Sequence, residues 1–449
     1  MSLAFHSTKE SLYLQVYDHY KNLIMEHRIP AGSRMPSLRK CATELKLSRT
    51  TIENAYLQLA ADGYIVARAQ SGYYVTSIAD QKPVSTASWH ADLPPVQYDF
   101  ASNGVDRESF RFDLWQRYIK SALRQSDRLL SYGEPQGEAD LRQVLADYIR
   151  QRRNVNCSAD DIVIGAGVQS LLNLLCPLIR DRKSVSFPNA SFVQGSTIFA
   201  GYGFEVQYRN KDCDVIYVSP AHMTKWGEVM PVSRRYELLG WAAKSDHHYI
   251  IEDDYDSELR LGGKPFPTLQ SIDVSDKVIY MNTFTKTLAS TVRISYMVLP
   301  QTLAEKFYRE LSFYSCTVSN FEQYTLAEFI ENGSFEKHIN RLRNYYQNKR
   351  DLILQALEKK PLGDYVTIEE EEAGVHFLMH LRTDLKEESI VTQAKSRGVK
   401  LKPLSGYYAD TAEAAKQENT YVMNYSSIDP AAMERAAGVL LHILQIPGR

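Results

Sequence analysis

The sequence predicts a multidomain chain, with a small α+β domain followed by a larger α/β domain that has a mostly parallel sheet. Short helical patterns and a hairpin pattern occupy residues 1–77. Residues 78–97 contain several Pro and Ser residues and show no apolar periodicity, which is typical of a linker. In residues 98–449, strand-like runs alternate with helical patterns, which indicates an α/β domain.

Size and composition allow two or three hydrophobic cores, because the chain has 449 residues and 44% of them are hydrophobic. The five cysteines form no C-x-x-C pair and no histidine cluster has zinc spacing, so we expect neither a disulfide framework nor a metal site. No uncharged apolar stretch approaches the ~18 residues of a membrane span, and residues 1–20 contain no signal-peptide core. We therefore expect a cytoplasmic protein without a membrane partner.

The first domain contains three helical patterns. The first ends before Pro30, and its apolar residues recur at three-to-four spacing: Tyr13, Val16, Tyr17, Tyr20, Leu23 and Ile24. A second helix follows Ser37, and a third comes after a short break at Lys46 and Leu47. Their apolar residues are Leu38, Cys41, Ala42 and Leu45, then Ile52, Ala55, Tyr56 and Leu59. Two short helices joined by a tight turn form a helix-turn-helix.

The third helix is a candidate DNA-reading helix. Ser48 is placed to cap it, and the residues near its N-terminus are then Arg49, Thr50 and Thr51. A recognition helix presents such side chains to base edges and phosphates. Strand-like runs at 64–68 and 73–76 predict a hairpin wing, and residues 1–77 carry a net charge of +3. The plainer alternative is a small helical domain with a hairpin and no DNA partner.

Over its whole length this domain resembles the GntR-type winged helix. The resemblance is carried by Gly32-Ser33-Arg34-Met35-Pro36-Ser37-Leu38-Arg39, Leu47-Ser48-Arg49-Thr50-Thr51, Asp62-Gly63-Tyr64 and Gly72-Tyr73-Tyr74-Val75. It implies double-stranded operator DNA as a partner, with Gly72 at the wing tip entering the minor groove. The other residues that it assigns to DNA binding are Arg34, Arg39, Ser48, Arg49, Thr50 and Thr51. Glu53 departs from the pattern, since many relatives carry a basic or neutral residue there.

The larger domain contains six strand-like runs separated by helical patterns. These runs are residues 161–164, 184–187, 215–218, 249–251, 278–281 and 294–299. Such alternation predicts a mostly parallel sheet with helices on both faces. In sheets of this kind, ligands bind at the carboxyl ends of the strands.

Three polar segments follow strands of this predicted sheet. Residues 165–170 end the first strand and open a helix, where free backbone N–H groups suit a phosphate. An acidic segment, 252–255, follows one strand, and a segment ending in a lysine, 282–286, follows the next. Each has a plain alternative when taken alone: a tight turn, a helix cap and a solvated lysine. Together, and in this order, they predict one ligand site.

These segments resemble the fold-type I aminotransferases as found in MocR regulators, and the resemblance covers essentially the whole chain. It is carried by Thr283-Phe284-Thr285-Lys286 with Arg293, Ile251-Glu252-Asp253-Asp254-Tyr255-Asp256-Ser257-Glu258, Met230-Pro231-Val232-Ser233-Arg234-Arg235, and Tyr132-Gly133-Glu134-Pro135-Gln136-Gly137 before Leu141-Arg142. It implies an α/β PLP-dependent transferase-like domain with large and small subdomains. The implied cofactor is pyridoxal 5'-phosphate (PLP).

The resemblance also implies roles for individual residues. Lys286 would form the internal aldimine, and Asp253 would pair with the protonated pyridine nitrogen. Tyr255 would hydrogen-bond the ring oxygen, and Phe192 would stack on the ring. The residues implied at the phosphate are Gly167, Val168, Gln169, Thr283, Thr285 and Arg293. Tyr132 would reach the phosphate from the other subunit, so a homodimer is implied, with the DNA-binding domain crossing to that subunit.

The sequence departs from the family at two places. Of a His-Gln-aromatic-Pro-x-Gly run, only His222 and Gly227 remain. The arginine that clamps the substrate carboxylate in aminotransferases has no counterpart in residues 419–425, and Gln194 replaces another possible anion-binding arginine. A buried carboxylate without a guanidinium partner is costly. We therefore expect PLP itself, or an amine without a tightly clamped carboxylate, as effector, unless a remote arginine such as Arg343 or Arg382 takes over.

The sequence thus favours a PLP-dependent DNA-binding transcription regulator whose aminotransferase-like domain senses PLP or an amino compound. The alternative is an active PLP-dependent aminotransferase with an accessory DNA-binding domain, which would need the missing clamp. A third interpretation is a vestigial dimerisation scaffold without cofactor. It conflicts with the presence of Lys286, Asp253 and Arg293.

Overall fold

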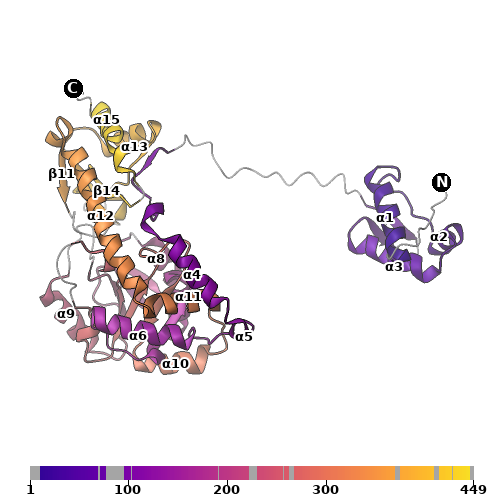
Figure 1. Cartoon of the computed structure of the whole chain (residues 1–449), viewed down its shortest axis with the longest axis horizontal. Helices are drawn as coiled ribbons and strands as arrows, with labels where there is room; N and C mark the ends of the chain where they lie inside the picture. Colours follow the sequence, from indigo (N-terminus) through magenta and orange to yellow (C-terminus); the bar gives the residue numbers. More distant parts are fainter. Residues whose placement is uncertain are drawn as a thin grey trace. The chain divides into compact units, whose positions relative to one another are not determined.

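The computed structural model describes residues 11–444, except for 69–70, 77–95, 103, 191, 222–229, 256, 262–266, 370–374, 409–413 and 427. The chain divides into two compact units, residues 1–93 and residues 94–449 (Figure 1). Each unit has a hydrophobic core of its own, and the second unit has several.

The first unit consists of three helices and a two-stranded hairpin. Its elements are α1 (Leu12–Met25), α2 (Leu38–Leu45), α3 (Arg49–Ala61), β1 (Ile65–Arg68) and β2 (Gly72–Val75). Ser37 and Ser48 cap α2 and α3, because each side chain accepts a hydrogen bond from a backbone N–H of the first turn. The two strands pair antiparallel, with Arg68 opposite Gly72. The predicted winged helix-turn-helix is confirmed.

Two local features set the angle between α2 and α3. Lys46 adopts a left-handed backbone with a φ of 52° and ends α2, at the break that the sequence predicts. Tyr56 of α3 is fully buried, and its hydroxyl donates a hydrogen bond to the Pro36 carbonyl oxygen at 3.0 Å. The start of α2 is thereby joined to the middle of α3, so the exposed N-terminus of α3 has a fixed position in this unit.

The second unit is built on a seven-stranded sheet with the strand order β4-β10-β9-β8-β7-β5-β6. The strands are β4 (Ile162–Gly165), β5 (Ser184–Phe187), β6 (Glu205–Tyr208), β7 (Val215–Val218), β8 (Tyr249–Asp253), β9 (Val278–Thr283) and β10 (Ser295–Val298). Only β10 runs antiparallel to its neighbours, β4 and β9. The predicted mostly parallel sheet is confirmed. It contains one more strand than predicted, because the edge strand β6 has no apolar run.

Helices cover both faces of this sheet (Figure 1). One face carries α7 (Val168–Leu178), α8 (Val193–Gly201) and α10 (Gln301–Leu311). The other carries α4 (Phe112–Ala122), α6 (Ala139–Arg153), α9 (Val232–Ala242), α11 (Asn320–Glu331) and the first part of α12 (Ser334–Glu358), and the short α5 (Ser126–Leu129) follows α4. Strand residues alternate between the faces. Ile251 and Met281 face α7 and α8, whereas Ile250 and Tyr280 face the other way.

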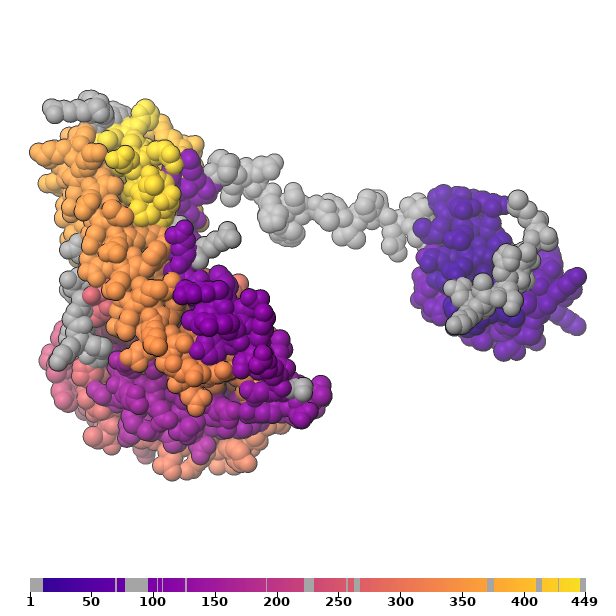
Figure 2. All heavy atoms as spheres, in the orientation of Figure 1, coloured from indigo at the N-terminus to yellow at the C-terminus, as the bar shows by residue number. Residues whose placement is uncertain are grey.

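The C-terminal part forms a smaller subdomain. Its elements are the antiparallel strands β11 (Val366–Glu369), β12 (His376–Leu381) and β14 (Thr420–Asn424), with α13 (Glu387–Ser396), α15 (Met433–Ile443) and the end of α12. Strand β13 (Val399–Lys400) pairs parallel with β3 (Tyr98–Asp99), so the start of the second unit joins its C-terminal part. Helix α15 lies at one end of the unit (Figure 2). Short 3-10 turns occur at 107–109, 159–161, 257–259, 270–272, 362–364, 405–407 and 430–432.

Two features are absent from the described ranges. No helix in them is both long and apolar enough to cross a membrane. Nor do they contain a group of three or more His, Cys, Asp or Glu side chains arranged to hold a metal ion. The five cysteines are free thiols, and four of them are buried.

Candidate functional site

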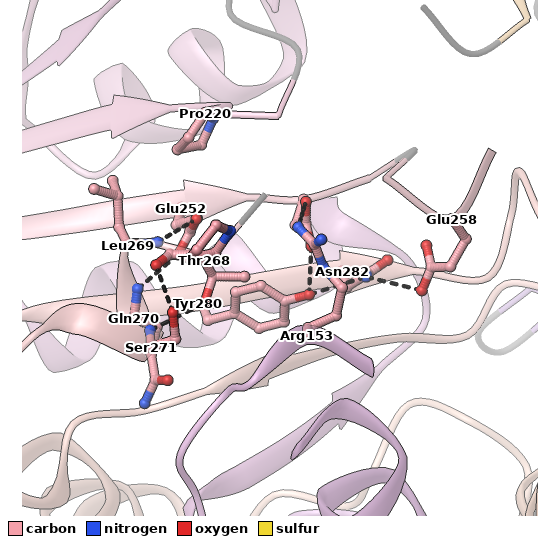
Figure 3. A network of polar contacts seen from close by, with 12 residues as sticks. Arg153, Pro220, Glu252, Glu258, Thr268, Leu269, Gln270, Ser271, Tyr280 and Asn282 are labelled. Atoms are coloured by element: carbon pink, nitrogen blue, oxygen red, sulfur yellow. Dashed lines mark hydrogen bonds and ion pairs between the residues drawn. The ribbon is translucent and has the colours of Figure 1, made fainter. Parts of the chain in front are cut away.

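Three consecutive acidic residues end strand β8, and strand geometry separates them. Because side chains alternate across a strand, Asp253 faces the side of α7 and α8, while Glu252 and Asp254 face the side of α6. Glu252 accepts hydrogen bonds from the backbone N–H groups of Leu269 at 2.8 Å and Gln270 at 2.9 Å (Figure 3). Glu252 therefore fastens the chain that leads into β9 and has a structural role.

Asp254 is bound inside the protein core. Arg153 of α6 donates to both carboxylate oxygens, at 2.8 and 2.9 Å, and the Tyr280 hydroxyl donates at 2.7 Å. Figure 3 shows Arg153 and Tyr280 converging beneath the sheet. Both partners of the ion pair are buried, with side-chain exposures of 6% and 1%. Since removal of one partner would leave an uncompensated buried charge, this pair anchors α6 to the end of β8.

Asp253 lies next to a cluster of aromatic rings. The Tyr217 hydroxyl of β7 donates a hydrogen bond to Oδ2 of Asp253 at 2.5 Å. The Tyr217 ring stacks on Phe187 with 5.1 Å between ring centroids, and lies 5.4 Å from the Phe192 ring. Phe192 is the residue before α8 and is half-buried. A Cβ at position 195 would lie 2.3 Å from the Phe192 ring, so a side chain there would displace that ring.

The start of α7 has the chemistry of an anion site. Gly167 precedes the helix with a φ of +89°, and a Cβ there would lie 2.3 Å from Nη2 of Arg293. Nη1 of Arg293 donates to Oγ1 of Thr285 at 3.4 Å, and the Thr283 hydroxyl donates to the same oxygen at 3.0 Å. The first helical residues are Val168 and Gln169. A guanidinium, hydroxyls and the N–H groups of a helix N-terminus are donors that suit a phosphate.

Thr317 is a residue of this region that sequence reasoning missed. Its Oγ1 accepts a hydrogen bond from the Ala166 backbone N–H at 2.9 Å and lies 2.9 Å from Oγ of Ser170. It comes from the segment between α10 and α11 and supports the turn that leads into α7. The sequence gives no signal for it, since it lies 151 residues from Ala166 and belongs to no recognisable motif.

Lys286 and Tyr255 come from neighbouring loops at one edge of the sheet. Strands β8 and β9 pair parallel, with Asp253 opposite Met281, so the segments after these strands start side by side. Lys286 and Arg293 both lie in the loop that joins β9 to β10. Both Lys286 and Tyr255 are half-buried. The fold therefore brings three parts together at the carboxyl edge of the sheet. These are Lys286, the ends of β8 and β9 with the nearby Tyr255 and Thr283, and the start of α7.

Tyr132, another predicted site residue, does not join this group at the carboxyl edge of the sheet within a single chain. Its side chain is 98% exposed. The turn that carries it is held by the buried Arg142, which donates to the Gly137 carbonyl oxygen at 2.9 Å and to Glu134 at 2.6 Å. Arg142 thus gives the motif before α6 a structural role and leaves Tyr132 pointing outward.

The positions where an arginine would bind a substrate carboxylate lie on the small sheet and on α8. Val422 is the half-buried residue of β14, Met423 belongs to the core of the small subdomain, and Gln194 is exposed. Two remote arginines have partners of their own. Arg343 donates to the Glu258 carbonyl oxygen at 2.6 Å, and Arg382 donates to the Asp364 carbonyl oxygen at 2.5 Å. His222 and Gly227 lie outside the described residues.

In the first unit, the predicted DNA-contacting residues lie at the exposed ends of α2 and α3 and on the hairpin. Ser48 caps α3 by accepting a hydrogen bond from the Thr51 N–H at 3.0 Å. Thr51 is half-buried, and the other members of the set are exposed: Arg34, Arg39, Ser48, Arg49, Thr50 and Gly72. The Arg34 guanidinium packs at the wing, since a Cβ on Gly72 would lie 3.6 Å from its Nε. Arg68, which was not predicted, lies 4.5 Å above the Tyr74 ring.

Known proteins resemble both units. Residues 12–75 match the family model "Bacterial regulatory proteins, gntR family", and residues 96–217 and 215–438 match "Aminotransferase class I and II". The uncharacterized HTH-type transcriptional regulator YdeL of Bacillus subtilis is 37% identical over 88% of this chain and 90% of its own length. The probable rhizopine catabolism regulatory protein MocR of Rhizobium meliloti is 28% identical over 96% and 93%. The chain belongs to the MocR-type transcriptional regulators.

Solved structures resemble the second unit of this MocR-type chain. The Pyrococcus horikoshii kynurenine aminotransferase, solved in complex with PMP, is 24% identical, with a TM-score of 0.64 over 79% of this chain and 91% of its own. An archaeal alanine:glyoxylate aminotransferase has 22% identity and a TM-score of 0.67 over 79% and 91%. These likenesses confirm the fold-type I aminotransferase-like fold. Family membership confirms the predicted function at the level of a DNA-binding transcription regulator.

A buried carboxyl group beneath the site makes stability depend on pH. Glu258 is 8% exposed, and Nδ2 of Asn282 donates to its Oε1 at 3.4 Å (Figure 3). Burial, and then the negative charge of Asp254, raise the pKa of Glu258 from 4.5 to about 7. The folded state therefore holds this proton more tightly than the unfolded state does. Its contribution to stability is complete below pH 4.5 and is lost as the pH rises through 7.

We predict that Glu258→Gln removes this loss, because the amide cannot ionise. The variant should gain stability relative to the unaltered chain as the pH rises from 4.5 to 8, by up to about 3 kcal/mol. Urea denaturation of the full chain at several pH values measures the difference. Glu331→Gln, at an exposed position of α11, is the matched control and should follow the unaltered chain. Parallel curves for Glu258→Gln and the unaltered chain would contradict the prediction.

Proposed function

We propose that this regulator binds PLP through Lys286 and that its aminotransferase-like unit reports PLP or an amino compound to the DNA-binding unit. The observation that carries the proposal is the packing of the Arg293 guanidinium against Gly167, at the N-terminus of α7. A side chain at position 167 would fill this space, so the glycine keeps the guanidinium and the helix N–H groups in one cradle. Such a cradle fits the phosphate group of PLP.

The remaining residues fit the other parts of the cofactor. Asp253 offers a carboxylate for the pyridine N–H, and ion pairing there would keep the ring protonated. Phe192 offers a ring face beside that carboxylate, joined to it through Tyr217. Tyr255 would donate to the ring oxygen, and the Lys286 amine would attach the cofactor covalently. When bound, PLP would supply an electron-withdrawing ring and a reactive carbonyl carbon.

A homodimer is part of the proposal. Tyr132 is almost fully exposed in a single chain, whereas its turn is held rigidly by the buried Arg142. A rigid turn that presents a tyrosine outward suits a contact with the phosphate site of a second copy. We extend the proposal to a DNA-binding unit that crosses to the other subunit and to a protein that works in the cytoplasm.

The alternative function, full transamination, is less well supported. It would need a guanidinium at the substrate carboxylate, but β14 carries Val422, and position 194 of α8 is an exposed glutamine. Arg343 and Arg382 each already bond a backbone carbonyl oxygen. A bound α-carboxylate would therefore lack a charge-assisted partner. The effector that fits best is PLP itself, or an amine without a tightly clamped carboxylate.

We predict that Lys286→Ala abolishes visible cofactor absorption in the purified, PLP-loaded protein and leaves the fold intact. The loss follows because no other amine would occupy the loop after β9. Absorbance spectra and borohydride reduction followed by mass measurement check it. Lys337→Ala, at an exposed position of α12, is the control and should keep the spectrum. A borohydride-fixed adduct in Lys286→Ala would refute the assignment.

We predict that Arg49→Ala weakens operator binding by about 1–3 kcal/mol, because Arg49 stands at the exposed start of α3 and would read a base. Arg39→Ala should weaken binding and also reduce the dependence on salt concentration, because a phosphate contact would be lost. Titrations at several salt concentrations separate the two effects. Arg28→Ala, which breaks an exposed pair with Glu26, is the control. Unchanged affinity in both variants would remove the DNA-contact assignment.

A further inference from the structure

Tyr217 holds the carboxylate that is proposed to face the cofactor ring. It lies on β7, which pairs parallel with β8, with Tyr217 opposite Ile251. Asp253 is the next residue of β8 on the same face, so the tyrosine reaches it diagonally across the two strands. The Tyr217 hydroxyl donates to Oδ2 of Asp253 at 2.5 Å. The two side chains thus form one unit in the sheet.

The direction of this hydrogen bond is fixed by the surroundings. Burial, and then the negative charge of Asp253, hold the pKa of Tyr217 well above its usual value of 10. The phenol therefore keeps its proton at any working pH, and its oxygen acts as a donor toward the carboxylate. A charge-assisted hydrogen bond of this kind draws part of the negative charge of a carboxylate toward the donor.

The Tyr217 ring is itself held in place. It is 3% exposed and stacks on Phe187, with an angle of 29° between the ring planes. Phe192 also packs against it, at an angle of 38°, and the Phe187 and Phe192 rings contact each other, with 6.4 Å between their centroids. A buried tyrosine that packs against both rings of this cluster cannot swing away from Asp253 without disturbing them. The hydrogen bond therefore restricts the carboxylate to one orientation, next to the ring that is proposed to stack on the cofactor.

We infer that Tyr217 is a positioning residue of the cofactor site, which orients Asp253 and moderates the negative charge that this carboxylate presents to the cofactor ring. The inference rests on the proposed binding of PLP through Lys286. Tyr217 acts through Asp253 and is not itself a catalytic residue.

The neighbouring acid provides an internal comparison. Asp254 also accepts a hydrogen bond from a buried tyrosine, Tyr280 of β9, at 2.7 Å. That pair faces α6 and also includes Arg153, on the side of the sheet opposite Asp253. Loss of either hydroxyl removes one buried hydrogen bond to one carboxylate, and loss of the Tyr280 hydroxyl also removes the hydrogen bond that it accepts from Nδ2 of Asn282 at 3.2 Å. Only the loss at position 217 should affect the cofactor.

The expected effect has a definite sign. Without the phenol, Asp253 presents more negative charge to the ring, and this charge stabilises a positively charged link between the cofactor and Lys286. The pH midpoint at which the visible absorption of the loaded protein changes should then rise. A more acidic phenol at the same place should draw more charge from the carboxylate and lower the midpoint.

The experiment is a pH titration of the absorption spectrum of the full, PLP-loaded chain, together with PLP affinity measured on the cofactor-free chain. We expect Tyr217→Phe to raise the midpoint by at least about half a pH unit and to weaken PLP binding about tenfold, as loss of one charge-assisted hydrogen bond implies. Tyr280→Phe should leave the midpoint in place and change the affinity less than twofold. Its effect should appear as a lower unfolding temperature.

A second variant keeps the test independent of folding. Replacement of Tyr217 by 3-fluorotyrosine retains the ring and the donor and makes the phenol more acidic, so the midpoint should move in the direction opposite to that of Tyr217→Phe. Equal midpoints and affinities in the unaltered chain and in both position-217 variants would overturn the role of Tyr217, while leaving PLP binding established. The complete absence of a visible band in the unaltered chain would instead overturn the cofactor proposal on which that role rests.

Discussion

The alternation of side chains at the end of β8 is the constraint on which the site depends. Arg153 and Tyr280 hold Asp254 on one side of the sheet, and two backbone N–H groups hold Glu252 on the same side. Asp253 therefore has to face the other side, where the Tyr217 hydroxyl donates a hydrogen bond to it. A slip of one residue would bury Asp253 against α6 and expose Asp254 to the site. The buried ion pair thus selects which carboxylate is available to a ligand.

The sequence predicts the strands and helix starts well, because the residues that determine them are neighbours in the chain. All six strand-like runs begin within one residue of an observed strand, because buried strands are short apolar runs, and the polar residues after them mark the ligand edge. The cap of α3 by Ser48 and the start of α2 after Ser37 were equally local. Partners distant in sequence could not be predicted: Arg153 lies 101 residues from Asp254, and Thr317 lies 151 from Ala166. Strand β6 was missed because its polar residues sit at a sheet edge.

The two halves of the candidate site differ in what they offer to a ligand. The part that would hold PLP is assembled from Gly167, Arg293, the two threonines and Asp253, all at the carboxyl edge of the sheet. The part that would hold a substrate carboxylate carries Val422, and the remote arginines bond elsewhere. A site with the proposed cofactor contacts and without a substrate clamp would suit binding and sensing better than turnover. This fits a chain whose other unit is a DNA-binding winged helix.

The central claim is that occupancy of the aminotransferase-like unit changes DNA binding. The most direct measurement is the affinity of the full chain for its operator, by fluorescence anisotropy at one fixed salt concentration, with and without saturating PLP. We expect PLP to change the affinity by at least about fivefold, the lower range of coupling between two sites, and to have no such effect on Lys286→Ala. Identical affinities of the PLP-loaded and PLP-free chains, with PLP demonstrably bound, would contradict a role for PLP as the signal.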